Sequence, residues 1–109
     1  MAKYETTVRG DFSAVLNKIT DGILNGSFTA SLEDSSDFRS GDARCSVRVF
    51  ERYSYMGSNR VSLNVTVFQN GGDPIKVSAI TSGGSQAMFF KVNTLGEEAF
   101  LDKLKEILE

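Results

Sequence analysis

The densest group of side chains that could do chemistry in this sequence is acidic. Four carboxylates lie within ten positions, on Glu33, Asp34, Asp37 and Asp42. Carboxylate oxygens suit calcium, but the spacing of an EF-hand loop and its closing glutamate are absent. We therefore predict no metal site, and we interpret residues 34–42 as a solvated polar loop whose acids can pair with Arg39 and Arg44.

The residue types give little support for catalysis. The chain of 109 residues contains no histidine and a single cysteine, Cys45. A serine or cysteine nucleophile would need lysine or a carboxylate as its base, and no spacing selects such a pair. Tyr53 and Tyr55 lie near a strand end beside Arg52, where tyrosines commonly serve packing. We predict a protein that is not an enzyme, with no catalytic residue and no cofactor.

The segment Thr81–Gln86 contains two adjacent glycines, whose backbone amides could converge on an anion. Anion-binding nests usually open a helix, whereas the residues that flank this segment alternate as strands do. The lysine and the following hydroxyl of a phosphate-binding loop are also missing. We favour a hairpin turn over an anion site.

The charges are segregated along the chain, although the net charge is only −2. Residues 43–92 carry six basic and two acidic side chains, whereas each flanking segment has a net charge of −3. A basic region with interleaved aromatic residues can hold phosphates and stack bases. The isoelectric point of about 5.1 argues against this, so we expect no nucleic-acid partner.

Alternation of apolar and polar residues predicts antiparallel strands over most of the chain. We expect strands at residues 2–9, 28–33, 43–55, 60–69, from 75 onward, and 88–92. In the strand 43–55 the small apolar residues Ala43, Cys45, Val47 and Val49 are predicted to face the core. Cys45 is then a small buried hydrophobe rather than a reactive thiol.

Two helices complete the predicted fold. Apolar residues recur at helical spacing from Phe12 to Leu24, with Asp11 as N-cap and Gly26 as a left-handed C-terminal residue. The segment Thr94–Glu97 fits a capping box before a second helix that ends near Leu108. The order β-α-β-β-β-β-β-α predicts an α+β fold with an antiparallel sheet of five to six strands and both helices on one face. It also resembles a reduced helix-grip arrangement.

The sheet face opposite the helices is the strongest candidate for binding, because each helix has only one apolar stripe and must lie on the core side. We predict that this uncovered face combines basic and apolar side chains: Arg44, Arg48, Phe50, Arg52, Phe68, Lys76, Ile80, Phe89 and Lys91. Exposed aromatic residues favour self-association, as a dimer, or a protein partner. An inert solvated face and an anionic ligand are the alternatives.

A second hypothesis places a small-molecule or anion site in a cavity between the sheet and the C-terminal helix, around Phe90, Phe100 and Leu104. We expect a single domain over residues 1–109, because the length allows one core. No segment approaches the roughly 18 apolar residues that span a bilayer, and no leader is apparent, so we expect a cytoplasmic protein without a membrane partner.

Four stretches of the chain look familiar together. They are SLEDSSDFRSGD from Ser31, RVFERYSYMGSNRVSLN from Arg48, AITSGGSQAMFF from Ala79 and GEEAFLD from Gly96. In these stretches the chain resembles a family of small single-domain bacterial proteins, mainly from Gram-positive species, that has no assigned function. The resemblance implies a small stand-alone bacterial protein, and it supplies no catalytic or binding residues.

Overall fold

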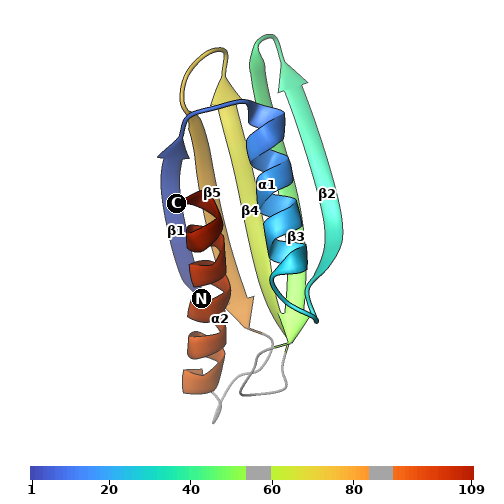
Figure 1. The fold of residues 1–109 in the computed structure, drawn as a ribbon, viewed down its shortest axis with the longest axis vertical. Helices are drawn as coiled ribbons and strands as arrows, with labels where there is room; N and C mark the ends of the chain where they lie inside the picture. The colour runs from blue at the N-terminus through green and yellow to red at the C-terminus, as the bar shows by residue number, and fades with distance from the viewer. Residues whose placement is uncertain (54–59, 84–89) are drawn as a thin grey trace.

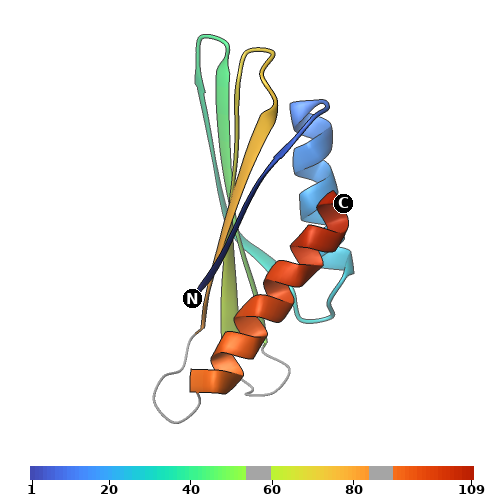
Figure 2. The same ribbon diagram turned by 90° about the vertical axis from the view of Figure 1, so that its left-hand side faces the viewer.

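A computed structural model describes residues 1–53, 60–83 and 90–109, with only the backbone described at 90–96. Five strands form one antiparallel sheet in the order β1-β5-β4-β3-β2 (Figure 1). The elements are β1 (Ala2–Val8), α1 (Phe12–Asn25), β2 (Ser31–Ser40), β3 (Ala43–Tyr53), β4 (Arg60–Asn70), β5 (Ile75–Gly83) and α2 (Phe90–Leu108). Both helices lie on the same side of the sheet (Figure 2). The predicted α+β fold is confirmed.

The hydrophobic core lies between the sheet and the two helices. Alternate residues of β4 and β5 point toward the helices and are buried, as the period of two predicts. Burying each of these apolar side chains contributes roughly 1.5–3 kcal/mol. The largest fully buried side chains include Ile19 and Ile23 from α1, Phe50 from β3, Leu63 from β4, Ile75 from β5, and Phe100 and Leu104 from α2.

Helix α1 begins where the sequence indicates. The Asp11 carboxylate accepts a hydrogen bond from the Ala14 amide at 3.0 Å, which satisfies one of the free amides of the first turn. At the other end, Gly26 has φ −85° and is therefore not left-handed, contrary to the prediction. Glycine is needed there for space, because an added Cβ would lie 2.8 Å from the Gly22 carbonyl oxygen and 3.0 Å from the Lys103 side chain.

The predicted acidic loop at residues 34–42 is wrong, because most of it belongs to strand β2. Ser31–Ser40 pairs with β3 along its length, with a bulge between Leu32 and Asp34. The strand is at the edge of the sheet and most of its residues are exposed, so the apolar alternation that identifies a half-buried strand is missing. A turn at Gly41, which has φ +57°, joins β2 to β3.

The predicted strand at residues 88–92 is also wrong where the structure describes it. Phe90 and Val92 belong to α2, and Thr94 lies inside this helix instead of capping it. A strand that returned from β5 through a hairpin would have no edge to join, because β5 already pairs with β4 on one side and with β1 on the other. Met88 lies outside the described residues.

Among the described residues, neither helix combines the length and the apolar character that a bilayer crossing requires.

Candidate functional site

The outer face of the sheet is the side that neither helix covers (Figure 2). The strand register places one row of side chains across this face, from edge to edge: Phe38, Cys45, Phe68, Lys76 and Thr7. Phe38 is 65% exposed and Phe68 is 37% exposed. Directly opposed residues on neighbouring strands lie about 4.5–5.5 Å apart at Cβ, so the two phenylalanines flank Cys45 in one continuous apolar row.

Neighbouring rows extend this apolar surface. Val47 and Val49 follow Cys45 on the same face of β3 and are half-buried. Ile80 on β5 is 41% exposed. It lies in the same row as Val49, with Asn64 between them. We call these six residues the outer apolar patch: Phe38, Cys45, Val47, Val49, Phe68 and Ile80.

The predicted faces of β3 are reversed in the structure. Phe50 is fully buried opposite Leu63, so Ala43, Cys45, Val47 and Val49 face outward. Cys45 is accordingly half-buried on the outer face rather than a core residue. A period of two establishes that the two faces of a strand differ, but the choice between them depends on what packs there. Burying Phe50 removes more apolar area from water than burying a valine.

The predicted interaction residues therefore divide between several places. Phe68, Lys76 and Ile80 lie on the outer face as predicted. The predicted residues from β3 lie on the helix side instead: Arg44, Arg48, Phe50 and Arg52. Lys91 is in α2 rather than on the sheet, and Phe89 lies outside the described residues. The basic and aromatic surface that the sequence predicted does not exist as one face.

Both edge strands carry charged residues on the outer face. The row through Asn64 runs from Lys3 on β1 to Asp34 on β2, with Ile80 and Val49 between. Both Lys3 and Asp34 are exposed. The carboxylate of Glu5, also on β1, accepts a hydrogen bond from the Ser78 hydroxyl at 3.3 Å. The interior strands also carry charges on this face, at Lys76 on β5 and at Arg60 and Glu51, which pair with each other at 2.7 Å.

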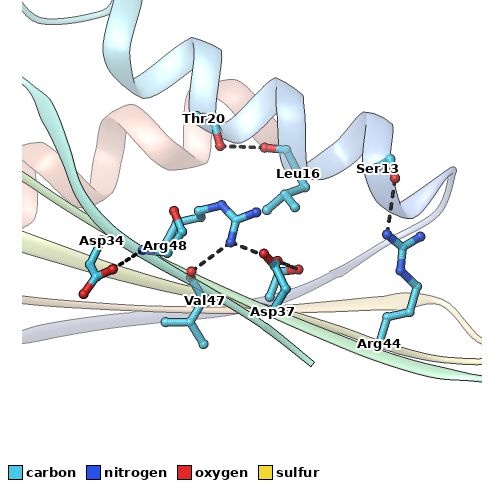
Figure 3. Close-up of polar contacts among 10 residues, drawn as sticks. Ser13, Leu16, Thr20, Asp34, Asp37, Arg44, Val47 and Arg48 are labelled. Carbon is cyan, nitrogen blue, oxygen red and sulfur yellow. Dashed lines mark hydrogen bonds and ion pairs between the residues drawn. The ribbon is translucent and has the colours of Figure 1, made fainter. Parts of the chain in front are cut away.

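Three arginines form a row on the helix side of β3, at Arg44, Arg48 and Arg52 (Figure 3 shows the first two). The Arg44 guanidinium lies 4.3 Å from the centre of the Phe12 ring, and it donates to the Ser13 hydroxyl at 3.4 Å. Arginine stems can cover apolar surface while the charged ends reach polar partners. This property explains how three arginines are accommodated beneath the helices, which residue type alone did not predict.

Arg48 pairs with Asp37 across the β2–β3 pair, at 3.0 Å (Figure 3). The Ser46 hydroxyl donates to the same carboxylate at 2.6 Å. The hydrogen bond from Ser46, followed by the bond and charge of Arg48, lowers the pKa of Asp37 below its ordinary 3.8. Asp37 and Asp34 point to opposite faces of the sheet, so the four predicted loop carboxylates do not converge.

The remaining candidates from the sequence carry no site in the part of the chain that the structure describes. No group of three or more histidine, cysteine, aspartate or glutamate side chains is arranged to hold a metal within residues 1–53, 60–83 and 90–109. Thr81 and Ser82 end strand β5, whereas the rest of the Thr81–Gln86 turn lies mostly outside the described residues. Tyr55 lies outside them as well. Phe100 and Leu104 are core residues with no exposed area.

The model of one protein family matches residues 1–109, which is the whole chain. The chain belongs to DUF6054, a family of unknown function. Membership of DUF6054 confirms the resemblance to a family without an assigned function. The bacterial origin of this family stays an expectation. Comparisons of this DUF6054 protein with curated proteins and with solved structures found no match.

Proposed function

We propose that this DUF6054 protein is a non-catalytic interaction domain that associates with a second copy of itself through the outer face of its sheet. The observation that carries the proposal is the outer apolar patch on a face that neither helix covers. Contiguous exposed apolar surface with a polar surround marks interaction sites in soluble proteins. The observed faces of β3 support the proposal. The three arginines predicted for the outer face lie on the helix side, and two valines and a cysteine lie on the outer face in their place.

The opposite charges of Lys3 and Asp34, at the two ends of one row, favour one arrangement of the two copies. Strand β4 is the central strand, so a two-fold axis parallel to β4 lays the β1 edge of one copy over the β2 edge of the other. Lys3 then faces Asp34 of the partner subunit, because the two residues occupy one row at equal distances from β4. Phe68, on β4 itself, packs against Phe68 of the partner subunit.

The size of the face is sufficient for a stable dimer. Five strands at a spacing of about 4.8 Å are about 24 Å wide, and nine residues of β5 at about 3.4 Å each are about 30 Å long. The flat area is about 700 Å² per copy, and the accessible area is larger because side chains project from it. Standard interfaces bury about 800 Å² per partner.

Light scattering over a wide concentration range tests the proposal directly. We expect the chain of 11.9 kDa to reach twice that mass at high concentration. Phe68→Ser should return it to the monomer mass with an unchanged circular dichroism spectrum, because Phe68 is not a core residue. Phe28→Ser is the matched control, since Phe28 is fully exposed but lies outside the sheet. A wild-type monomer up to roughly 1 mM would refute the proposal.

A charge reversal tests the orientation of the axis. Lys3→Asp and Asp34→Lys each replace two attractive pairs in the dimer with two repulsive ones. At about 0.5 kcal/mol for each exposed pair, the change is about 2 kcal/mol, or about thirtyfold in the dimer dissociation constant. The double variant restores both pairs in reversed form and should recover most of the affinity. If it dimerises no better than the single variants, the axis is not parallel to β4.

A further inference from the structure

A pocket of about 910 Å³ opens on the helix side of the molecule, away from the outer face. It lies where the C-terminal turn of α1, the segment between α1 and β2, the end of β3 and α2 meet. Among the residues whose side chains the structure describes, its lining is Leu24, Asn25, Gly26, Ser27, Phe28, Thr29, Ala30, Arg52, Tyr53 and Ala99. The size falls in the range of small-molecule sites.

Arg52 supplies the positive charge of this pocket. Its guanidinium lies 4.4 Å from the centre of the Phe100 ring, and Phe100 has no exposed area. The guanidinium is half-buried, and this burial lowers the pKa of Arg52 below its ordinary value. Arginine still remains charged at neutral pH, so the cost of removing it from water has to be offset by other contacts.

Among the described residues, the Arg52 guanidinium lacks an acceptor, unlike those of Arg44, Arg48 and Arg60, and the only other strand arginine without one is the exposed Arg39 of edge strand β2. Arg48 pairs with Asp37, Arg60 pairs with Glu51 at 2.7 Å, and Arg44 donates to the Ser13 hydroxyl. No hydrogen bond or ion pair within residues 1–53, 60–83 and 97–109 involves the Arg52 guanidinium. Residues 54–59 and 84–96 contain no aspartate or glutamate. A carboxylate from this chain therefore does not neutralise Arg52.

The rest of the pocket is suited to an apolar body beside that charge. Phe28 is fully exposed in the segment before β2, and Leu24, Ala30 and Ala99 add aliphatic surface. Asn25, Ser27 and Thr29 are the polar residues of the lining, and the Thr29 hydroxyl already accepts a bond from the Tyr53 amide at 3.1 Å. One strong cation in a rim of mixed polar and apolar residues favours a ligand with one anionic group.

The C-terminal turn of α1 limits the charge of that ligand. Its last carbonyl groups carry the partial negative charge of the helix end and lie beside the pocket. They would repel a dianion such as phosphate more than a monoanion. We propose that this pocket binds a small organic carboxylate with an aromatic or other apolar body. The carboxylate pairs with Arg52, and the apolar body packs against Phe28.

Titration with 2-naphthoate, followed by amide NMR, tests this site. We expect saturable shifts at Asn25, Thr29 and Ala99. The neutral analogue 2-naphthalenemethanol should bind at least tenfold more weakly, because it lacks the charge-assisted bond to Arg52. Inorganic phosphate should leave these amides unshifted. Shifts confined to the outer apolar patch, equal binding of the neutral analogue, or binding of phosphate at this pocket would each overturn the proposal.

Variants separate the role of Arg52 from general effects on the fold. Arg52→Gln should weaken 2-naphthoate binding at least tenfold, and Phe28→Ala should weaken it several-fold. Arg44→Gln is the matched control. The Arg44 guanidinium also stacks on a phenylalanine ring, that of Phe12 in α1, but Arg44 does not line this pocket. An equal loss of affinity for 2-naphthoate in Arg44→Gln and Arg52→Gln would refute the pairing of the carboxylate with Arg52. If Arg52→Gln does not fold, the comparison of 2-naphthoate with its neutral analogue on the unaltered chain still tests whether the pocket binds the carboxylate.

Discussion

Which side of β3 faces outward decides which residues form the outer apolar patch. A pair of isosteric substitutions, one in β3 and one in β4, tests this orientation. Val49 is half-buried on the outer face of β3, whereas Val65 is fully buried on the helix side of β4. Val→Thr keeps the shape and the β-branching of the side chain, so strand propensity changes little in either position. The difference between the two variants therefore measures the burial of one hydroxyl.

The expected magnitudes follow from burial. At Val65 the new hydroxyl is removed from water among core side chains, which costs about 1–3 kcal/mol. At Val49 it stays in reach of solvent, and the cost should be below about 0.5 kcal/mol. For a domain of this size, each 1 kcal/mol corresponds to roughly 4–8 °C in Tm.

Urea denaturation followed by circular dichroism, at a concentration low enough to keep the chain monomeric, gives both free energies of unfolding. Phe50→Ala belongs in the same series, because Phe50 is fully buried and its truncation should cost about 3–5 kcal/mol. If Val49→Thr lowers the free energy of unfolding as much as Val65→Thr does, or more, then Val49 faces the core. The outer apolar patch, and the dimer built on it, would then be wrong.

Two further predictions concern the helix side of the molecule. Hydrogen bonds and Arg48 lower the pKa of Asp37 in the folded state, so its contribution to stability is present above pH 3.8 and is lost as the pH falls through the folded-state pKa. Asp37→Asn should thus reduce the free energy of unfolding at pH 7 and converge with wild type in acid, and a constant difference from pH 7 to pH 2 would contradict this. Gly22→Ala should destabilise the chain despite a gain of about 1 kcal/mol in helix propensity, because an added Cβ would lie 2.6 Å from Ile107 Cδ1. Thermal melts of Gly22→Ala with and without Ile107→Ala check the cause, since only a steric clash is relieved by the smaller partner.

Local patterns were sufficient for the parts of the fold where one face of an element is continuously apolar. The inward residues of β4 and β5, the apolar stripe of α1 and the Asp11 cap are all confirmed, because each depends on neighbours in the sequence. Phe68, Lys76 and Ile80 were placed on the outer face for the same reason. The Arg52 pocket had no such signal, since its described lining comes from three segments that are distant in the chain, residues 24–30, 52–53 and Ala99.

Amino-acid sequence by itself determined the α+β class, the faces of β4 and β5 and the start of α1, because hydrophobic periodicity and caps act over a few residues. Tertiary structure decided the rest. Strand β2 exists because β3 offers it a pairing edge, although its residues are mostly polar. A sixth strand is excluded beside β5 because β1 occupies that edge. The faces of β3 follow from the burial of Phe50 against Leu63, and this choice moved three arginines inward and exposed the apolar patch. Pairing and packing across the sheet join residues that are far apart in the chain, and no local pattern encodes which neighbour will be there.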